Sequence, residues 1–179
     1  MKYFYSITSL VLFAVILAFL VGCFNAYFYP MKYSDTIEKV AEEYQISASL
    51  IASVANAESG FKEDAVSSKG AVGIMQIMPD TAKWLAEKMD IDYSKDMLKD
   101  AEYNIQMGAF YISYLKQIFS NQKTVLCAYN AGIGNVRQWL KDEKYSADGQ
   151  SLKEIPFKET KNYVNRVLKN NYYYKNKYK

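Results

Sequence analysis

Residues 47–60 read SASLIASVANAESG, and this stretch has the signature of a short buried helix. Ser47 is a residue type that can cap a helix, and Gly60 is placed to end it in a left-handed turn. The apolar positions recur at the three- and four-residue spacing of one helix face. They are Leu50, Ile51, Val54 and Ala55. The stretch therefore predicts a helix with one face in a hydrophobic core.

Glu58 lies four residues after Val54 and seven after Ile51, so the helix places it on the apolar face. Burial in an apolar pocket disfavours a charged carboxylate and raises its pKa. A glutamic acid in this position can stay protonated near neutral pH and donate a proton. Taken alone, a solvated glutamate near a helix end is the more frequent case. Whether Glu58 is a buried proton donor or a solvated glutamate therefore depends on the motifs around it.

The rest of the chain after Pro30 carries further helical periodicity without convincing strand alternation. We expect a brief β-like turn between Phe61 and Ile77, and a mainly α fold of short helices packed at varied angles. Met75 and Ile77 are predicted to point into the core. The other helical patterns start near residues 34, 79, 100, 124, 135 and 159.

An uncharged run extends from Tyr3 to Met31, and residues 10–21 within it are almost wholly apolar. About 20 such residues span a bilayer, which predicts a membrane anchor over residues 1–30 and a globular domain over residues 31–179. A cleaved signal peptide and a lipid-modified Cys23 are the alternatives. Lys2 and Lys32 nearly balance across the run, so charge leaves its orientation undetermined.

Composition excludes several classes of function. The chain has no histidine, which removes His-based triads, His metal ligands and a His general base. A net charge of +3 is too weak a basic bias for a typical nucleic-acid binder. Neither a disulfide nor a metal site is suggested by Cys23 and Cys127, and Cys127 is expected to be a small buried hydrophobe. We expect no metal and no cofactor.

Three further blocks accompany the one at Glu58, and together they carry a family resemblance. The blocks are Glu58-Ser59-Gly60-Phe61, then Gly73-Ile74-Met75-Gln76-Ile77-Met78-Pro79, Ala128-Tyr129-Asn130-Ala131-Gly132, and Glu159-Thr160-Lys161-Asn162-Tyr163-Val164. In this order the sequence resembles the soluble lytic transglycosylase family of lysozyme-like enzymes. The resemblance covers roughly residues 35–170 and departs in minor ways, such as isoleucine at position 74.

The resemblance implies a peptidoglycan-cleaving enzyme with a lysozyme-like helical fold. It implies that Glu58 is the catalytic acid and base, and that Tyr163 hydrogen-bonds and orients its carboxyl group. A buried structural tyrosine is the alternative for Tyr163. The implied substrate-binding residues are Ser67, Gln76, Met78, Tyr129 and Asn130.

Only Glu58 stands at a catalytic position in these blocks, whereas hydrolases normally use two carboxylates. Asp64 and Asp80 suit surface and helix-start roles, and Glu159 suits a helix start. This favours transglycosylation to 1,6-anhydromuramyl ends, with a lysozyme-type hydrolase as the alternative. A silent glycan-binding module and a membrane-anchored interaction protein leave the blocks less well explained.

The expected partners are peptidoglycan glycan strands and the cytoplasmic membrane, with the domain on the cell-wall side and no nucleic acid. The basic, tyrosine-rich stretch 169–179 is expected to be a frayed and solvated tail, with contact to anionic polymers or headgroups as the alternative.

Overall fold

The apolar N-terminal run forms one helix, α1 (Lys2–Phe28). A computed structural model describes residues 2–178, with side chains from residue 9 onward. Its contacts divide the chain into two compact units, with the boundary between Lys32 and Tyr33. Ser9–Phe28 has a mean hydropathy of 2.4 with none of it buried. By length and composition this helix can cross a bilayer, as the helix of a signal sequence also can.

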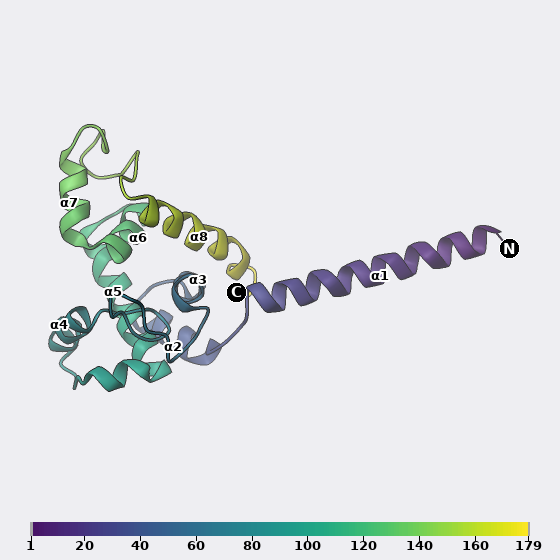
Figure 1. Ribbon diagram of the computed structural model, residues 1–179, viewed down its shortest axis with the longest axis horizontal. Coiled ribbons are helices and arrows are strands. Elements are labelled where there is room, and N and C mark those ends of the chain that lie inside the picture. Colours follow the sequence, from purple (N-terminus) through teal and green to yellow (C-terminus); the bar gives the residue numbers. More distant parts are fainter. Residues whose placement is uncertain (1, 179) are drawn as a thin grey trace. The chain divides into compact units, whose positions relative to one another are not determined.

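The second unit is helical throughout its regular elements, which confirms the mainly α prediction. Its helices cross at varied angles (Figure 1). In order they are α2 (Ser34–Glu43), α3 (Ala48–Ser59), α4 (Pro79–Met89), the 3-10 helix η1 (Lys95–Lys99), α5 (Ala101–Ile118), α6 (Gln122–Ala131), α7 (Ile133–Lys141) and α8 (Lys158–Tyr174).

Helix α3 lies at the centre of this unit and packs most extensively against α8, with further contacts to α2 and α5. Its residues from Ser49 to Ala55 are buried, because neighbours cover the helix on several sides. Gly60 ends it with a φ of 64°, as expected. Ser47 occupies the N-cap position of α3 as predicted, but its side chain makes no cap hydrogen bond with the helix.

The segment between α3 and α4 folds back on itself through two isolated β-bridges, Val66 to Val72 and Val72 to Ile77. This confirms the brief β-like turn. Met75 and Ile77 are buried, again as predicted. Gly73 has a φ of 82°, and a Cβ there would overlap Asn104 and the Leu98 carbonyl. Only glycine therefore allows the turn to sit this close to α5.

Asn104, on α5, holds this turn in place through hydrogen bonds of its side chain. Its Oδ1 accepts a hydrogen bond from the Met75 amide at 2.7 Å. Its Nδ2 donates to the carbonyls of Val72 at 3.0 Å and Leu98 at 2.9 Å. The side chain is fully buried, so these bonds satisfy groups that water cannot reach. Asn104 thus holds the turn and the start of α5 together.

The predicted frayed tail is wrong for the first half of the stretch 169–179. Helix α8 continues to Tyr174, and Asn170, Asn171 and Tyr174 are buried. The reason is tertiary, because α3 supplies a surface for these residues. Asn56, for example, donates to the Tyr174 hydroxyl at 3.0 Å.

Cys127 is fully buried as predicted.

Candidate active site

Glu58 lies in the last turn of α3, just beyond the buried residues Ser49 to Ala55 of that helix. It is half-buried, and this desolvation raises the pKa of its carboxyl group to about 7. The nearby Tyr163 hydroxyl and Arg166 charge lower the pKa, while the Glu159 charge raises it. Near neutral pH the carboxyl group is therefore divided between its acid and base forms, as an acid-base catalyst requires.

Tyr163 reaches Glu58 from α8, whose packing along α3 brings the two side chains together. Its ring is 1% exposed, with Arg166 Cζ 6.0 Å from the ring centroid. Burial and the Glu58 charge hold the pKa of the phenol well above its usual range, so it remains a donor. Its oxygen makes no hydrogen bond of ordinary geometry within residues 2–178. Its contact with Glu58 nevertheless shifts the pKa values of both groups.

Tyr129 enters the site from α6 and is tied to the turn before α4. Its hydroxyl donates to the Met75 carbonyl at 2.9 Å. Burial is the main cause that raises the pKa of this phenol well above its usual range, and the Glu58 charge raises it further. Tyr129 therefore stays protonated, and its side chain lies between α6 and the turn before α4.

Gln76 takes a left-handed conformation with a φ of 50°. Its Nε2 donates to the carbonyls of Ala65 at 3.0 Å and Gly73 at 2.9 Å. These two bonds use both amide hydrogens and offset the strain of the backbone. The amide nitrogen thus braces the loop, which leaves the carbonyl oxygen as the group that can meet a substrate.

These side chains line a cleft of about 400 Å³. A second hollow of about 240 Å³ adjoins it and shares Gln76, Met78, Tyr129 and Asn130 with it. The two form one groove across the turn, α6 and the start of α8. The groove brings together every predicted site residue except Tyr163, which is buried. Its first part is lined by Glu58, Ser67, Ser68, Lys69, Ala71, Gln76, Met78, Tyr129, Asn130 and Glu159.

Comparison with known proteins assigns the family. Residues 35–151 match the family described as Transglycosylase SLT domain. The chain belongs to the SLT domain family. The soluble lytic murein transglycosylase of Escherichia coli K12 is 36% identical over 151 residues, which cover 82% of this chain and 23% of that protein. The membrane-bound lytic murein transglycosylase C of Pectobacterium atrosepticum is 31% identical over 159 residues, covering 76% of this chain and 44% of that protein.

Solved structures agree with this membership. An inactive glutamate-to-glutamine mutant of lytic transglycosylase Slt from Pseudomonas aeruginosa aligns with a TM-score of 0.75 and 35% identity, over 85% of this chain and 25% of that one. The 70 kDa soluble lytic transglycosylase of Escherichia coli aligns with a TM-score of 0.73 and 34% identity, over 83% and 25%. The lysozyme-like helical fold is thereby confirmed. This SLT domain spans only about a quarter of those proteins.

Ser67 holds the rim of the SLT domain's groove in shape. Its Oγ accepts from the Ala71 amide at 3.0 Å, and its amide donates to the Ala71 carbonyl at 2.9 Å. The side chain lines the cleft beside Glu58, so it can still offer its hydroxyl to a sugar. Its substrate-binding role stays a prediction, as do those of the other groove residues.

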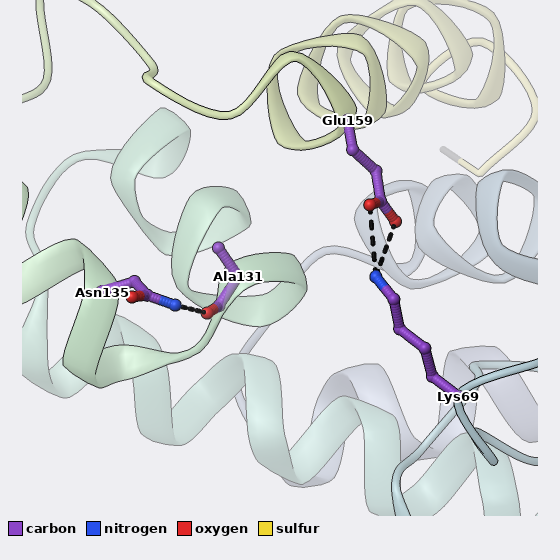
Figure 2. A network of polar contacts seen from close by, with 4 residues as sticks. All are labelled: Lys69, Ala131, Asn135 and Glu159. Carbon is purple, nitrogen blue, oxygen red and sulfur yellow. Dashed lines mark hydrogen bonds and ion pairs between the residues drawn. The ribbon is translucent and has the colours of Figure 1, made fainter.

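One feature of the groove could not be read from the motifs: an ion pair at its mouth. Lys69 Nζ lies 3.2 Å from Glu159 Oε2, with both side chains about three-quarters exposed (Figure 2). The pair links the rim loop to the first turn of α8. Nearby, Asn135 donates to the Ala131 carbonyl at 2.8 Å and joins α7 to the end of α6 (Figure 2). The motifs did not indicate the first link, because Lys69 lies outside the blocks and 90 residues from Glu159 along the chain.

The pH profile of the SLT domain tests the contact between Tyr163 and Glu58. The acid form of Glu58 is lost as the pH rises through about 7, so the parent's activity should fall on that alkaline side. The Tyr163 hydroxyl lowers the pKa of Glu58, and Tyr163→Phe should therefore move this limb to higher pH. We expect the maximal rate to drop about tenfold, which corresponds to losing about 1.4 kcal/mol of interaction between the Tyr163 hydroxyl and the carboxyl group during the reaction.

Tyr172→Phe is the matched control, since Tyr172 lies exposed on the same helix. Its rate and profile should equal those of the parent. A Tyr163→Phe enzyme with an unchanged rate and an unchanged alkaline limb would assign Tyr163 a purely structural role.

Proposed function

We propose that the chain is a peptidoglycan lytic transglycosylase that cuts the β-1,4 bond between N-acetylmuramic acid and N-acetylglucosamine and leaves 1,6-anhydromuramyl ends. The observation that carries this proposal is Glu58, a half-buried carboxyl group with a pKa raised to about 7 in an open groove. Relatives named lytic murein transglycosylases support it, as does the inactive glutamate-to-glutamine mutant of one of them.

In the first step, neutral Glu58 gives its proton to the glycosidic oxygen, and the bond from that oxygen to C1 of the muramyl ring breaks. In the second step, the Glu58 carboxylate takes the proton of the muramyl 6-hydroxyl, whose oxygen forms a bond to C1. The substrate's acetamido group can bridge the two steps. Glu58 ends protonated, and no water is consumed. An attack within one ring replaces the second catalytic group.

The groove suits an extended glycan. Ser67, Asn130 and the Gln76 carbonyl offer hydrogen-bonding groups for hydroxyl and acetamido substituents. The 40% exposed Met78 and the Tyr129 ring offer apolar surface for sugar faces. We assign these five residues to substrate binding and Glu58 with Tyr163 to catalysis.

The products test the reaction type. Digestion of purified peptidoglycan by the full chain should release muropeptides with 1,6-anhydromuramyl ends, about 18 mass units lighter than hydrolysed ones because water is not added. Mass spectrometry of the digest measures this directly. If only reducing muramic acid ends appear, the lysozyme-type hydrolase replaces this proposal. If sacculi are bound but no fragments are released, the silent glycan-binding module does.

We also propose that residues 1–30 anchor the protein in the cytoplasmic membrane and that residues 31–179 form the catalytic domain on the cell-wall side. The length and apolarity of α1 support an anchor, as does similarity to relatives named membrane-bound. Protease added to intact wall-stripped cells should degrade the domain. Complete protection would contradict this topology, and a mature protein that begins at a lipid-modified Cys23 would replace the spanning helix with a lipid anchor.

A further inference from the structure

A row of aromatic rings leads out of the catalytic groove along α4 and α5. It begins at Tyr129, which lines both hollows of the groove, and passes to Tyr111, whose ring centroid lies 5.2 Å from that of Tyr129. The Trp84 centroid follows at 6.3 Å from Tyr111, and the Tyr114 centroid at 4.9 Å from Trp84. Neither Trp84 nor Tyr114 lines either hollow, so the row continues past the end of the groove.

The packing of α4 against α5 brings these rings together (Figure 1). Thr81, which lines the second hollow, and Trp84 are three residues apart on α4, so they lie on one face of that helix. Tyr111 and Tyr114 have the same spacing on α5. Where the groove ends, the seam between the two helices therefore continues as the pair Trp84 and Tyr114, which we call the aromatic platform.

The aromatic platform lies at the surface. Trp84 and Tyr114 are half-buried, whereas the other tryptophan, Trp139, is only 7% exposed. The two rings of the platform stand at 82° to each other, and Lys88 Nζ lies 5.1 Å from the Trp84 centroid and 5.3 Å from that of Tyr114. A cation–π contact at an exposed site is weak, so a ligand that covers these rings can displace Lys88. Core packing alone does not explain aromatic surface left open at the end of a groove.

Tyr111 joins the aromatic platform to the groove and carries a polar group that points to a ligand. Its side chain is 8% exposed and lines the second hollow. Its hydroxyl makes no hydrogen bond within residues 2–178, and it is not among the buried oxygens that solvent cannot reach. Burial raises the pKa of this phenol to about 12, so it stays protonated. An accessible donor in such a place suits a hydroxyl or acetamido oxygen of a sugar.

We propose that the aromatic platform is a saccharide subsite that binds a distal sugar of the strand held in the groove, and that Tyr111 donates a hydrogen bond to the sugar before it. This inference rests on the proposed function, since the strand that reaches the platform is the one cut at Glu58. The face of a pyranose ring presents C–H groups, which the negative face of an aromatic ring attracts. Continuity with the groove selects a glycan as the occupant. The platform therefore makes substrate binding depend on strand length.

Peptide-free glycan strands separated by length test the subsite, with the full chain in a nonionic detergent. Trp84→Leu should raise KM for long strands about tenfold while kcat stays within about twofold of the parent, because it removes binding far from the reacting bond. KM for the shortest strands that the parent cleaves should not change, since these strands end before the platform. Trp84→Phe keeps an aromatic face, and its KM for long strands should stay within about threefold of the parent.

Tyr172→Leu is the matched control, since it removes an exposed aromatic ring from α8, outside the groove, and should leave KM unchanged for both lengths. Fluorescence gives a second readout, because the chain has 2 tryptophans and Trp139 is buried. In a Glu58→Gln background, which prevents cleavage, long strands should change the tryptophan emission up to a saturating limit. Adding Trp84→Phe to that background should abolish the change.

Several results would overturn the subsite. They are a Trp84→Leu protein that loses thermal stability but keeps the KM values of the parent, equal rises in KM for short and long strands, and an emission change that survives Trp84→Phe. Each of them would give Trp84 a structural role and leave the proposed function standing, because the parent still cleaves the strands. A parent that neither binds nor cleaves any strand would instead contradict the proposed function, and the subsite with it.

Discussion

Glu58→Gln is expected to reduce glycan cleavage by about 10³-fold while leaving the helical fold intact. Glutamine keeps the shape of the side chain and its hydrogen bonds, but it has no proton to transfer at neutral pH. The raised pKa of Glu58 makes the loss specific, since it is the acid form that the substitution removes. Release of soluble muropeptides measures the rate, and circular dichroism measures the fold.

Two further variants make this result interpretable. Glu143→Gln changes an exposed glutamate far from the motif blocks and should leave the rate unchanged. Glu159→Gln removes the other carboxylate that lines the cleft, where it is paired with Lys69. A single-carboxylate mechanism predicts that Glu159→Gln retains most activity. A loss as severe as that of Glu58→Gln would instead support a two-carboxylate hydrolase.

Asn104→Ala is expected to lower the free energy of unfolding by about 3 kcal/mol, because it removes three buried hydrogen bonds. The backbone groups that Asn104 bonded would then be buried with no hydrogen-bond partner. The turn that carries Gln76 and Met78 should loosen as well, so activity should fall more than the unfolded fraction explains. Denaturant unfolding and muropeptide release on the same sample measure the two effects.

Asn135→Ala is the matched control for this variant. Asn135 makes one exposed hydrogen bond, to the Ala131 carbonyl, and its loss should cost well under 1 kcal/mol. Equal destabilisation by the two substitutions would show that Asn104 does not hold the turn.

The amino-acid sequence by itself determined the local structure. Helical patterns indicated each α-helix of the second unit but not the 3-10 helix η1, and Gly60 and Pro79 marked a helix end and a helix start correctly. The same spacing placed Glu58 on the buried face of α3, from which its raised pKa follows. These features depend on residues within one or two helical turns of each other. The periodicity of apolar residues in the sequence indicates such short-range structure.

Only the tertiary structure decided which distant residues meet. Tyr163 contacts Glu58 because α8 packs along α3, and that packing also buries three residues in the first half of the stretch predicted as a frayed tail. No periodicity marked Asn104, since an asparagine in a helix gives no sign of the three backbone groups it will satisfy. The Lys69 to Glu159 pair has the same origin. Contacts of this kind depend on how helices pack, which local patterns do not encode.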